Sequence, residues 1–344
     1  MELSEDMTLD PVHPANHAEF GKLTEPHRHE LQVHCYRMLG SFHDAEDLVQ
    51  ETFMRAWQKL HTYEGRGSFR AWLYKIATNA CLDALDHRPK RTLPVLYQEA
   101  SDPTKPPLAP VVEPIWLEPI PDDLLIEGDS GPEARYTSRE SVTLAFLAAL
   151  QILPSRQRVI LILRDVLDWQ ASQTATLLGL TVPAVNSALH RARTTLAKHY
   201  HPNESHKKPN LHEANATAVQ SLLDRYVKAW ENADIDGLVA LLKEDATFPM
   251  PPSPSWYRGK GAIRTFIAQK ILDGDARGRY RFVPTRANGQ PAFGWYRRDE
   301  TTGKFHGFAI QVLTFDGELI SDITTFIIPD LLPRFGLPAE LSAL

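Results

Sequence analysis

The segment from Asp44 to Arg91 contains side chains suited to two kinds of binding. Its first half is acidic, and carboxylates can pair with the cations of a basic partner surface. Its second half combines aromatic rings, amides, hydroxyls and cations, which can stack on bases, contact base edges and neutralise phosphate. The candidates of the first half are Asp44, Glu46, Asp47, Gln50 and Glu51. Those of the second half are Tyr63, Arg66, Arg70, Tyr74, Lys75, Thr78, Asn79 and Arg88.

Two helices must position these side chains. Apolar residues recur at helical spacing from Ala45 to Leu60 and again from Phe69 to Ala84, with a glycine loop at residues 64–68 between them. The acidic candidates lie beside or opposite the first apolar stripe. The polar, basic and aromatic candidates of the second helix lie away from the second stripe. Phe69 and Trp72 fall on that stripe, so we expect them in the core.

A third set of candidates lies between Trp169 and Lys198. A short helix is followed by Gly179, which suits a helix end, and by Thr181 as the N-cap of a longer helix. Two helices joined by such a turn, with a polar and basic face on the second, indicate a helix-turn-helix. An ordinary helical hairpin would have the same spacing. Amides and guanidinium groups can contact base edges and phosphates. The outward candidates are Thr181, Asn186, Ser187, His190, Arg191 and Arg193.

The C-terminal part of the chain changes structural class. Two amphipathic helices after Val219 are followed by strand-like runs with turns at Asn288-Gly289 and Asp316-Gly317. Helices followed by antiparallel strands predict an α+β domain. Its polar or amphipathic side chains give no recognisable catalytic base. The candidates for a pocket are Asp245, Trp256, Tyr257, His306 and Asp322.

The expected organisation is therefore multidomain, with two all-α domains and one α+β domain. We expect the first helical domain at residues 17–92, a proline-rich linker at 93–135, the helix-turn-helix domain at 136–201 and the α+β domain at 214–330. The net charge of −6 hides a segregation of charge, because residues 99–133 contain nine acids against Lys105 alone. Within the linker, VVEPIWLEPI is too apolar for a passive spacer, and its tryptophan indicates a docking motif. An ordinary linker that covers a patch is the alternative.

Several classes of protein are disfavoured by the sequence. The acidic N-terminus has no basic-then-apolar order, and no apolar run approaches the length that spans a bilayer, so we expect a cytoplasmic protein without a membrane segment. Cys35 and Cys81 are expected to be buried in a reducing compartment. His27, His29 and His34 lack the spacing of a metal site, so no metal and no cofactor is predicted.

Three stretches resemble known families. DAEDLVQETFMRAW followed by GSFRAWLYKIATNACLD resembles region 2 of bacterial sigma-70-family RNA polymerase sigma factors of the extracytoplasmic-function (ECF) group. LPSRQRVILILRDVLDWQASQTATLLGLTVPAVNSALHRARTTL resembles region 4 of the same group. LLDRYVKAWENADIDGLVALLKEDATFPMPP, with WYRGKGAIRTFI, resembles the SnoaL-like, ketosteroid-isomerase-like cone domain, and WLEP resembles a linker motif of sigma factors that carry it.

The resemblance implies a transcription-initiation factor that performs no covalent chemistry. Its partners would be promoter DNA and core RNA polymerase, through the beta-prime clamp and the beta flap. The acidic helix would dock on the clamp, the second helix would bind the minus-10 element, and the helix-turn-helix would bind the minus-35 element. The SnoaL-like domain would regulate activity. Two alternatives stay open: a helix-turn-helix regulator that acts without core polymerase, and a small-molecule-binding or isomerase-like activity in the C-terminal domain.

Overall fold

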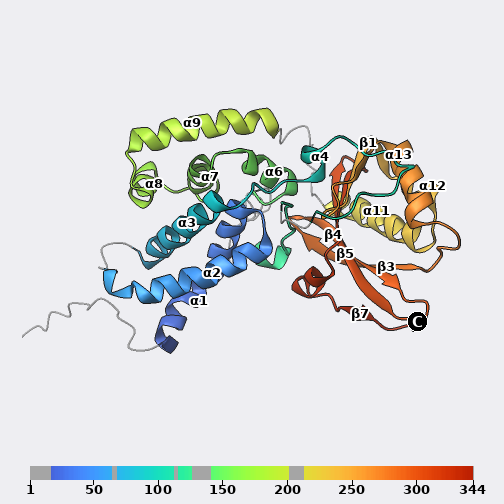
Figure 1. Ribbon diagram of the computed structural model, residues 1–344, viewed down its shortest axis with the longest axis horizontal. Helices are drawn as coiled ribbons and strands as arrows, with labels where there is room; N and C mark the ends of the chain where they lie inside the picture. The colour runs from blue at the N-terminus through green and yellow to red at the C-terminus, as the bar shows by residue number, and fades with distance from the viewer. Residues whose placement is uncertain (1–16, 64–67, 112–114, 126–140, 201–212, 344) are drawn as a thin grey trace, which may run out of the picture. The chain divides into compact units, whose positions relative to one another are not determined.

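The computed structural model describes residues 17–63, 68–111, 115–125, 141–200 and 213–343 (Figure 1). The chain divides into two compact units. Unit 1 comprises Met1–Arg88 and Leu153–Arg193, and unit 2 comprises Pro89–Ile152 and Thr194–Leu344. The division falls inside the segment expected to form the helix-turn-helix domain, so the first helix of that segment belongs to unit 2. None of the described helices is both long enough and apolar enough to cross a membrane.

Unit 1 is helical throughout its described residues. Its α1 begins at His17, and Phe20 near the start of this helix packs edge-on against Trp57 at 5.2 Å between ring centroids. The last helix continues past Arg193 into unit 2. The elements are α1 (His17–Leu39), α2 (Phe42–Gln58), η1 (Leu60–Thr62), α3 (Phe69–His87), α7 (Ser155–Leu161), η3 (Ile162–Val166), α8 (Ala171–Leu178) and α9 (Val182–His199).

Helix ends in unit 1 follow local capping chemistry. The hydroxyl of Ser41 accepts a hydrogen bond from the backbone N–H of Asp44 at the start of α2, and Ser68 caps α3 in the same way. Helix α8 ends at Gly179, whose φ of 65° is the left-handed conformation that glycine adopts without strain. The hydroxyl of Thr181 then accepts a hydrogen bond from the N–H of Ala184, which confirms the predicted turn and N-cap.

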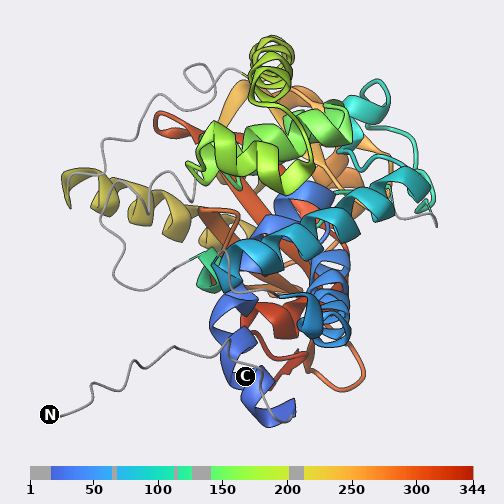
Figure 2. The same ribbon diagram turned by 90° about the vertical axis from the view of Figure 1, so that its left-hand side faces the viewer.

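The exposed face of α3 differs from the expectation. Tyr74 and Thr78, expected to face outward, are buried, whereas Phe69 and Trp72, expected in the core, are half-buried. The reason is that α3 packs on two sides. Helices α1 and α2 lie on one side of it, and α7 and α8 pack against another (Figures 1 and 2). The apolar stripe of the sequence predicts only one of these two buried sides of α3.

Unit 2 has the predicted α+β fold, built on a seven-stranded sheet in the order β2-β1-β6-β5-β4-β3, with β7 paired to β5. Adjacent strands are antiparallel except β1 and β6, which are parallel. The short strands β2 and β7 were not expected from the sequence. The strands are β1 (Leu242–Pro249), β2 (Trp256–Arg258), β3 (Tyr280–Ala287), β4 (Gln290–Arg298), β5 (Phe305–Asp316), β6 (Leu319–Phe326) and β7 (Glu340–Leu341). The helices are α4 (Pro94–Tyr97), η2 (Asp122–Leu125), α6 (Leu144–Ile152), α11 (Glu213–Glu231), α12 (Ile235–Ala240), α13 (Lys260–Phe266), η4 (Ile267–Ile271) and η5 (Pro329–Phe335).

The two faces of this sheet have different coverings. The inner face packs against α11 and α13, and its core is rich in stacked aromatic rings, among them Trp230, Phe282 and Trp295. On the outer face, a side chain at Gly294 would collide with Leu337, because the C-terminal segment runs close over the strands there. Burial of large rings on the inner face supplies most of the hydrophobic stabilisation of this unit.

The β3–β4 hairpin has the predicted two-residue turn. Asn288 and Gly289 have φ angles of 55° and 74°, the pair of positive values that a type I′ turn requires. Asn288 is completely buried despite its place in a turn. This burial indicates that another part of unit 2 covers the hairpin.

Candidate functional site

The acidic face of α2 is partly neutralised within unit 1. Asp44 forms an ion pair with Arg88 at 2.6 Å, and Glu51 forms one with Arg55 at 2.6 Å. Asp47 and Gln50 are exposed, and Glu46 is half-buried. The side chains most open to a partner on this face are therefore Asp47 and Gln50.

An aromatic cluster stands at the start of α3. The ring of Tyr63 lies 5.4 Å from those of Phe69 and Trp72, and all three side chains are half-buried. Such rings keep one face available for stacking. Lys75 and Asn79 are exposed on the same helix. Arg66, another candidate, lies outside the described residues.

The cation and the hydroxyl groups nearest this cluster already have partners. Arg70 pairs with Glu30 at 2.6 Å and lies over the ring of Tyr74. Tyr74 donates a hydrogen bond to Glu30 and contacts the ring of Trp169 at 5.2 Å, and burial raises the pKa of its phenol. Thr78 hydrogen-bonds to the buried His34 at 3.0 Å. Tyr74 and Thr78 are therefore structural groups in this conformation.

A hollow of about 710 Å³ lies between α3 and α8 in unit 1. Tyr63, Arg70 and Lys75 line one side of it, and Gln173 and Thr176 line the other. Three minus-10 candidates thus share a hollow with the first helix of the helix-turn-helix. The sequence contains no local signal for this pairing, because the two sets are about 100 residues apart.

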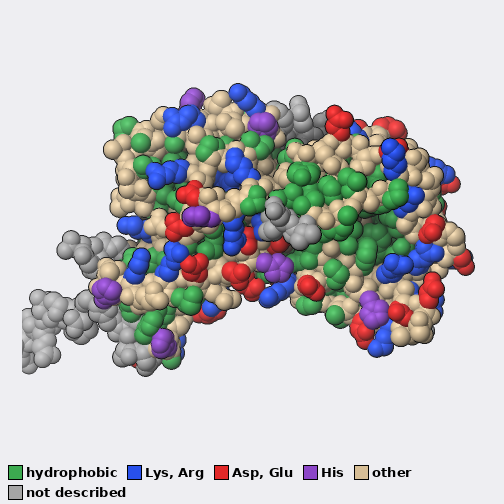
Figure 3. Space-filling view, viewed as in Figure 1, with side chains coloured by type: hydrophobic (Ala, Val, Ile, Leu, Met, Phe, Trp, Pro, Cys, Tyr) green, Lys and Arg blue, Asp and Glu red, His purple; other side chains and the backbone are tan. Residues whose placement is uncertain are grey.

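The outward face of α9 matches the prediction. Its candidate side chains are all exposed, and the space-filling view shows Lys, Arg and His side chains along α9 (Figure 3). Arg191 donates a hydrogen bond to the hydroxyl of Ser187 at 2.8 Å. Because a hydroxyl is neutral, this bond does not compensate the positive charge of the guanidinium. Arg193 instead forms a bidentate pair with Asp165 at 2.7 and 2.9 Å. Arg191 is therefore the more available cation of the two.

The pocket candidates of unit 2 do not form a single group. Trp256, Asp322 and Asp245 line one cavity of about 560 Å³ on the outer face of the sheet. Tyr257 belongs to the core on the inner face. His306 lies at the exposed start of β5, 3.6 Å from Glu340 of β7. The predicted pocket is thus divided between two faces and one end of the sheet.

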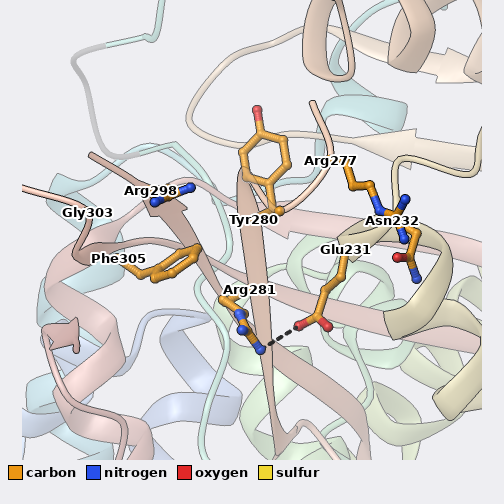
Figure 4. Close-up of a pocket in the computed structure, with 9 residues that line it drawn as sticks. Glu231, Asn232, Arg277, Tyr280, Arg281, Arg298, Gly303 and Phe305 are labelled. Carbon is orange, nitrogen blue, oxygen red and sulfur yellow. Dashed lines mark ion pairs between the residues drawn. The ribbon is translucent and has the colours of Figure 1, made fainter. Parts of the chain in front are cut away.

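Sequence reasoning missed a basic hollow of about 320 Å³ at the start of β3. Figure 4 shows Arg281 directed toward Glu231, with which it forms a 3.9 Å ion pair, while Arg277 lies beside Asn232 on another wall. Arg298 adds a third guanidinium to the lining. Three cations against one carboxylate suit a carboxylate or phosphate group chemically. These arginines come from separate segments, which is why no motif indicates them.

The apolar linker segment is held on unit 2. Trp116 is buried, and its carbonyl accepts a hydrogen bond from Arg91 at 2.7 Å. Further along, Ile120 exchanges two hydrogen bonds with Asn288, donating to its side-chain oxygen at 3.1 Å and accepting from its N–H at 3.0 Å. Asp122 completes the contact by pairing with Arg286 at 2.8 Å. The β3–β4 turn and the linker therefore form one hydrogen-bonded structure.

Family comparisons divide the chain into three parts. The family model for sigma-70 region 2 matches residues 23–90, and that for sigma-70 region 4 matches residues 143–196. The SnoaL-like domain family matches residues 223–323. These ranges contain the α2–α3 surface, the helix-turn-helix and most of the sheet, respectively.

Comparisons with whole proteins agree. The chain is 42% identical over 341 residues to the ECF RNA polymerase sigma factor SigG of Mycobacterium tuberculosis, covering 98% of this chain and 89% of that protein. It is 26% identical to the ECF sigma factor SigW of Bacillus subtilis, over 58% of this chain and 97% of that protein. The crystal structure of M. tuberculosis sigma factor SigJ shares the fold, with a TM-score of 0.58, 20% identity, and coverage of 92% of this chain and 99% of that one. This chain therefore belongs to the ECF RNA polymerase sigma factors and carries a C-terminal SnoaL-like domain.

Proposed function

We propose that this sigma factor docks on core RNA polymerase through α2, binds the minus-10 element through η1 and α3, and reads the minus-35 element through α9. The exposed basic face of α9 supports the last assignment, because Asn186 and Arg191 can reach base edges without rearrangement. In this proposal α2 meets the beta-prime clamp, and region 4 meets the beta flap. That the chain performs no covalent chemistry, and needs no metal or cofactor, stays a prediction.

The exposed positions of α2 favour a role in association with polymerase. Asp47 and Gln50 are accessible, whereas Asp44 and Glu51 are already paired with arginines. Complementary charge at the edge of an interface mainly raises the association rate. In this proposal, Asp47 makes the first contact with a basic surface of the clamp. Asp44 and Glu51 contact the clamp later, after their ion pairs within unit 1 have opened.

Binding of the minus-10 element requires unit 1 to open. The hollow between α3 and α8 measures about 710 Å³, which is the size of a small-molecule pocket and far too small for a DNA duplex. Tyr63, Trp72 and Lys75 line this hollow, so a duplex can enter it and contact all three side chains only after α8 moves away. The closed form of unit 1 is, in this proposal, a state of the sigma factor before promoter binding.

We infer that the SnoaL-like domain restrains this opening through the linker. The observation that carries the inference is the hydrogen-bonded contact of Ile120 and Asp122 with the turn at Asn288. Asn288 also donates to the carbonyl of Val142 at 2.7 Å, just before α6, the first helix of region 4. One buried side chain thus holds both the linker and the entrance to region 4.

The restraint matters because the two promoter elements are far apart. Their names place them about 25 base pairs from one another, which is about 85 Å of B-form DNA at ~3.4 Å per pair. A free linker could span that distance, but a linker pinned at residues 91–122 to one body has a shorter free length. Release from Asn288 would therefore favour the extended, promoter-bound form.

The test is run-off transcription by core polymerase with the full chain, on a promoter found by sequencing transcripts made from genomic DNA with the holoenzyme. Asn288→Gly preserves the positive φ of the turn and removes both side-chain hydrogen bonds, so we expect several-fold more transcript. Asn288→Asp is the matched control, because it keeps the acceptor for the N–H of Ile120. Its transcript yield should lie between those of the wild type and Asn288→Gly. Equal transcript from all three proteins, at equal thermal stability, would contradict control through the linker. No promoter-specific transcript from any of them would contradict the assigned promoter contacts.

A further inference from the structure

The cavity on the outer face of the unit 2 sheet has walls of two chemical kinds. One wall is formed by strands β1, β2, β5 and β6 and is polar, with Thr247, Asp322 and Thr324 in its lining. The other wall is formed by α4 and α6 and is apolar, with Leu93 and Ala148 in its lining. Its volume of about 560 Å³ lies in the range of sites for small organic ligands.

The polar wall contains a half-buried carboxyl group, that of Asp322. Asp322 accepts hydrogen bonds from the hydroxyls of Thr247 and Thr324, and no Lys or Arg among the described residues forms an ion pair with it. Burial raises the pKa of Asp322 to about 6, so the group is still largely ionised at neutral pH. The backbone N–H of Thr324 is a third donor to Asp322, and three donors still leave part of the acceptor capacity of a carboxylate unused. A carboxylate that has lost much of its contact with water and has no counter-charge is costly, and a cation beside it would lower that cost.

The other charged groups of the cavity do not supply this cation. Lys243 is bound to Asp316 at 2.5 Å and lies 3.8 Å from Asp245. Arg258 lines the cavity but is exposed. His199 is also exposed. The lining therefore contains three carboxylates against Lys243 and Arg258.

We propose that this cavity binds a small amphipathic amine, with its ammonium group beside Asp322 and its hydrocarbon part against α6 and α4. This inference rests on the proposed regulatory function, because α4 belongs to the linker and α6 begins region 4. A ligand here contacts three elements: the SnoaL-like sheet, the linker and region 4. The site lies on the face opposite the aromatic core that α11 and α13 cover.

The probe for the test is cyclohexylmethylamine, compared with cyclohexylmethanol, which has the same ring and a neutral hydroxyl. Dissociation constants are measured by ligand-observed NMR on the full chain. We expect the amine to bind at least tenfold more tightly than the alcohol. Asp322→Asn keeps the shape of the side chain and should weaken amine binding at least tenfold while leaving the alcohol within twofold.

Two further variants locate the site. Ala148→Phe places a ring in the cavity from α6 and should abolish binding of both probes, even if Asp322→Asn lowers the thermal stability. Arg298→Gln, in the basic hollow at the start of β3, should leave amine binding within twofold. Equal binding of amine and alcohol, or amine binding that survives both Asp322→Asn and Ala148→Phe, would overturn the proposal. Those outcomes are independent of the transcription test at Asn288, which would still report on the linker.

Discussion

Helices α3 and α9 both present polar and aromatic or basic residues for DNA, but they differ in the number of their packed sides. Helix α9 packs on one side, and its candidate side chains are exposed. Helix α3 packs against α1 and α2 and also against α7 and α8, so Tyr74 and Thr78 are buried. For the promoter contacts proposed above, α9 is therefore accessible as it stands, whereas the buried residues of α3 become accessible only after α7 and α8 move away.

The second covering of α3 can be broken at Arg158 in α7. Its guanidinium is buried and donates to the carbonyls of Met38 and Leu153. Arg158→Ala leaves these acceptors unpaired and opens a cavity, so we expect unfolding of unit 1 to be easier by about 4 kcal/mol. Amide hydrogen exchange in α3 should accelerate around Tyr74. Arg156→Ala, an exposed position on the same helix, should change stability by less than about 0.5 kcal/mol. Unchanged exchange in α3 after Arg158→Ala would show that α7 does not protect it.

The buried side of α3 also predicts a pH dependence. Burial lowers the pKa of His34 to about 3, with smaller contributions from the positive charges of Arg37 and Arg70. The unfolded chain binds the proton near pH 6.5, so the folded state is fully favoured above that pH and loses stability as the pH falls toward 3. Between pH 6.5 and pH 4 we expect a loss of about 3 kcal/mol.

The measurement compares urea unfolding of the wild type with His34→Gln over this pH range. Glutamine keeps a hydrogen-bonding group near Thr78 and does not titrate. Asp322, whose pKa is raised to about 6, contributes in the opposite direction, because its folded form binds the proton more tightly and loses stability as the pH rises from about 4 to 6. That contribution is present in both proteins and cancels in their difference. If the difference in unfolding free energy between the two proteins does not vary with pH, then the pKa of His34 is not lowered by burial, and its imidazole is in contact with water.

What the sequence can predict depends on how local the structural cause is. The cap at Thr181, the turn at Gly179 and the exposed face of α9 depend on neighbouring residues, and the structure confirms them. The burial of Tyr74 depends on Trp169, which is remote in sequence, so no periodicity reveals it. The same holds for unit 2, where the parallel pairing of β1 with β6 sets Thr247 opposite Asp322. Strand order decides which candidates share a cavity, and His306 is left at another end of the sheet.

On α9, Arg191 provides the direct test of the exposed surface. Among the described residues it has no acidic partner, and its guanidinium donates a hydrogen bond to the hydroxyl of Ser187. Arg191→Ala should weaken binding to minus-35 DNA about tenfold, which corresponds to ~1.4 kcal/mol and lies within the value of one good base or phosphate contact. Fluorescence anisotropy at fixed salt measures it, because phosphate contacts depend strongly on ionic strength. Binding as tight as that of the wild type would assign Arg191 to the scaffold.

Arg193 differs from Arg191 on the same helix, because Asp165 holds the guanidinium of Arg193 in a bidentate pair. Arg193→Ala should therefore weaken minus-35 binding by only about twofold, less than Arg191→Ala, since a surface ion pair is worth ~0.2–1 kcal/mol. Asp165→Asn frees the guanidinium and should tighten binding by a similar factor. Asp168→Asn removes a nearby exposed acid that forms no ion pair among the described residues, and so measures the general effect of one negative charge. Two results together would contradict a restraint of Arg193 by Asp165. The first is an equal gain in DNA affinity from Asp165→Asn and from Asp168→Asn. The second is the same gain from Asp165→Asn in a protein that also carries Arg193→Ala, which would show that Asp165 acts through its charge alone.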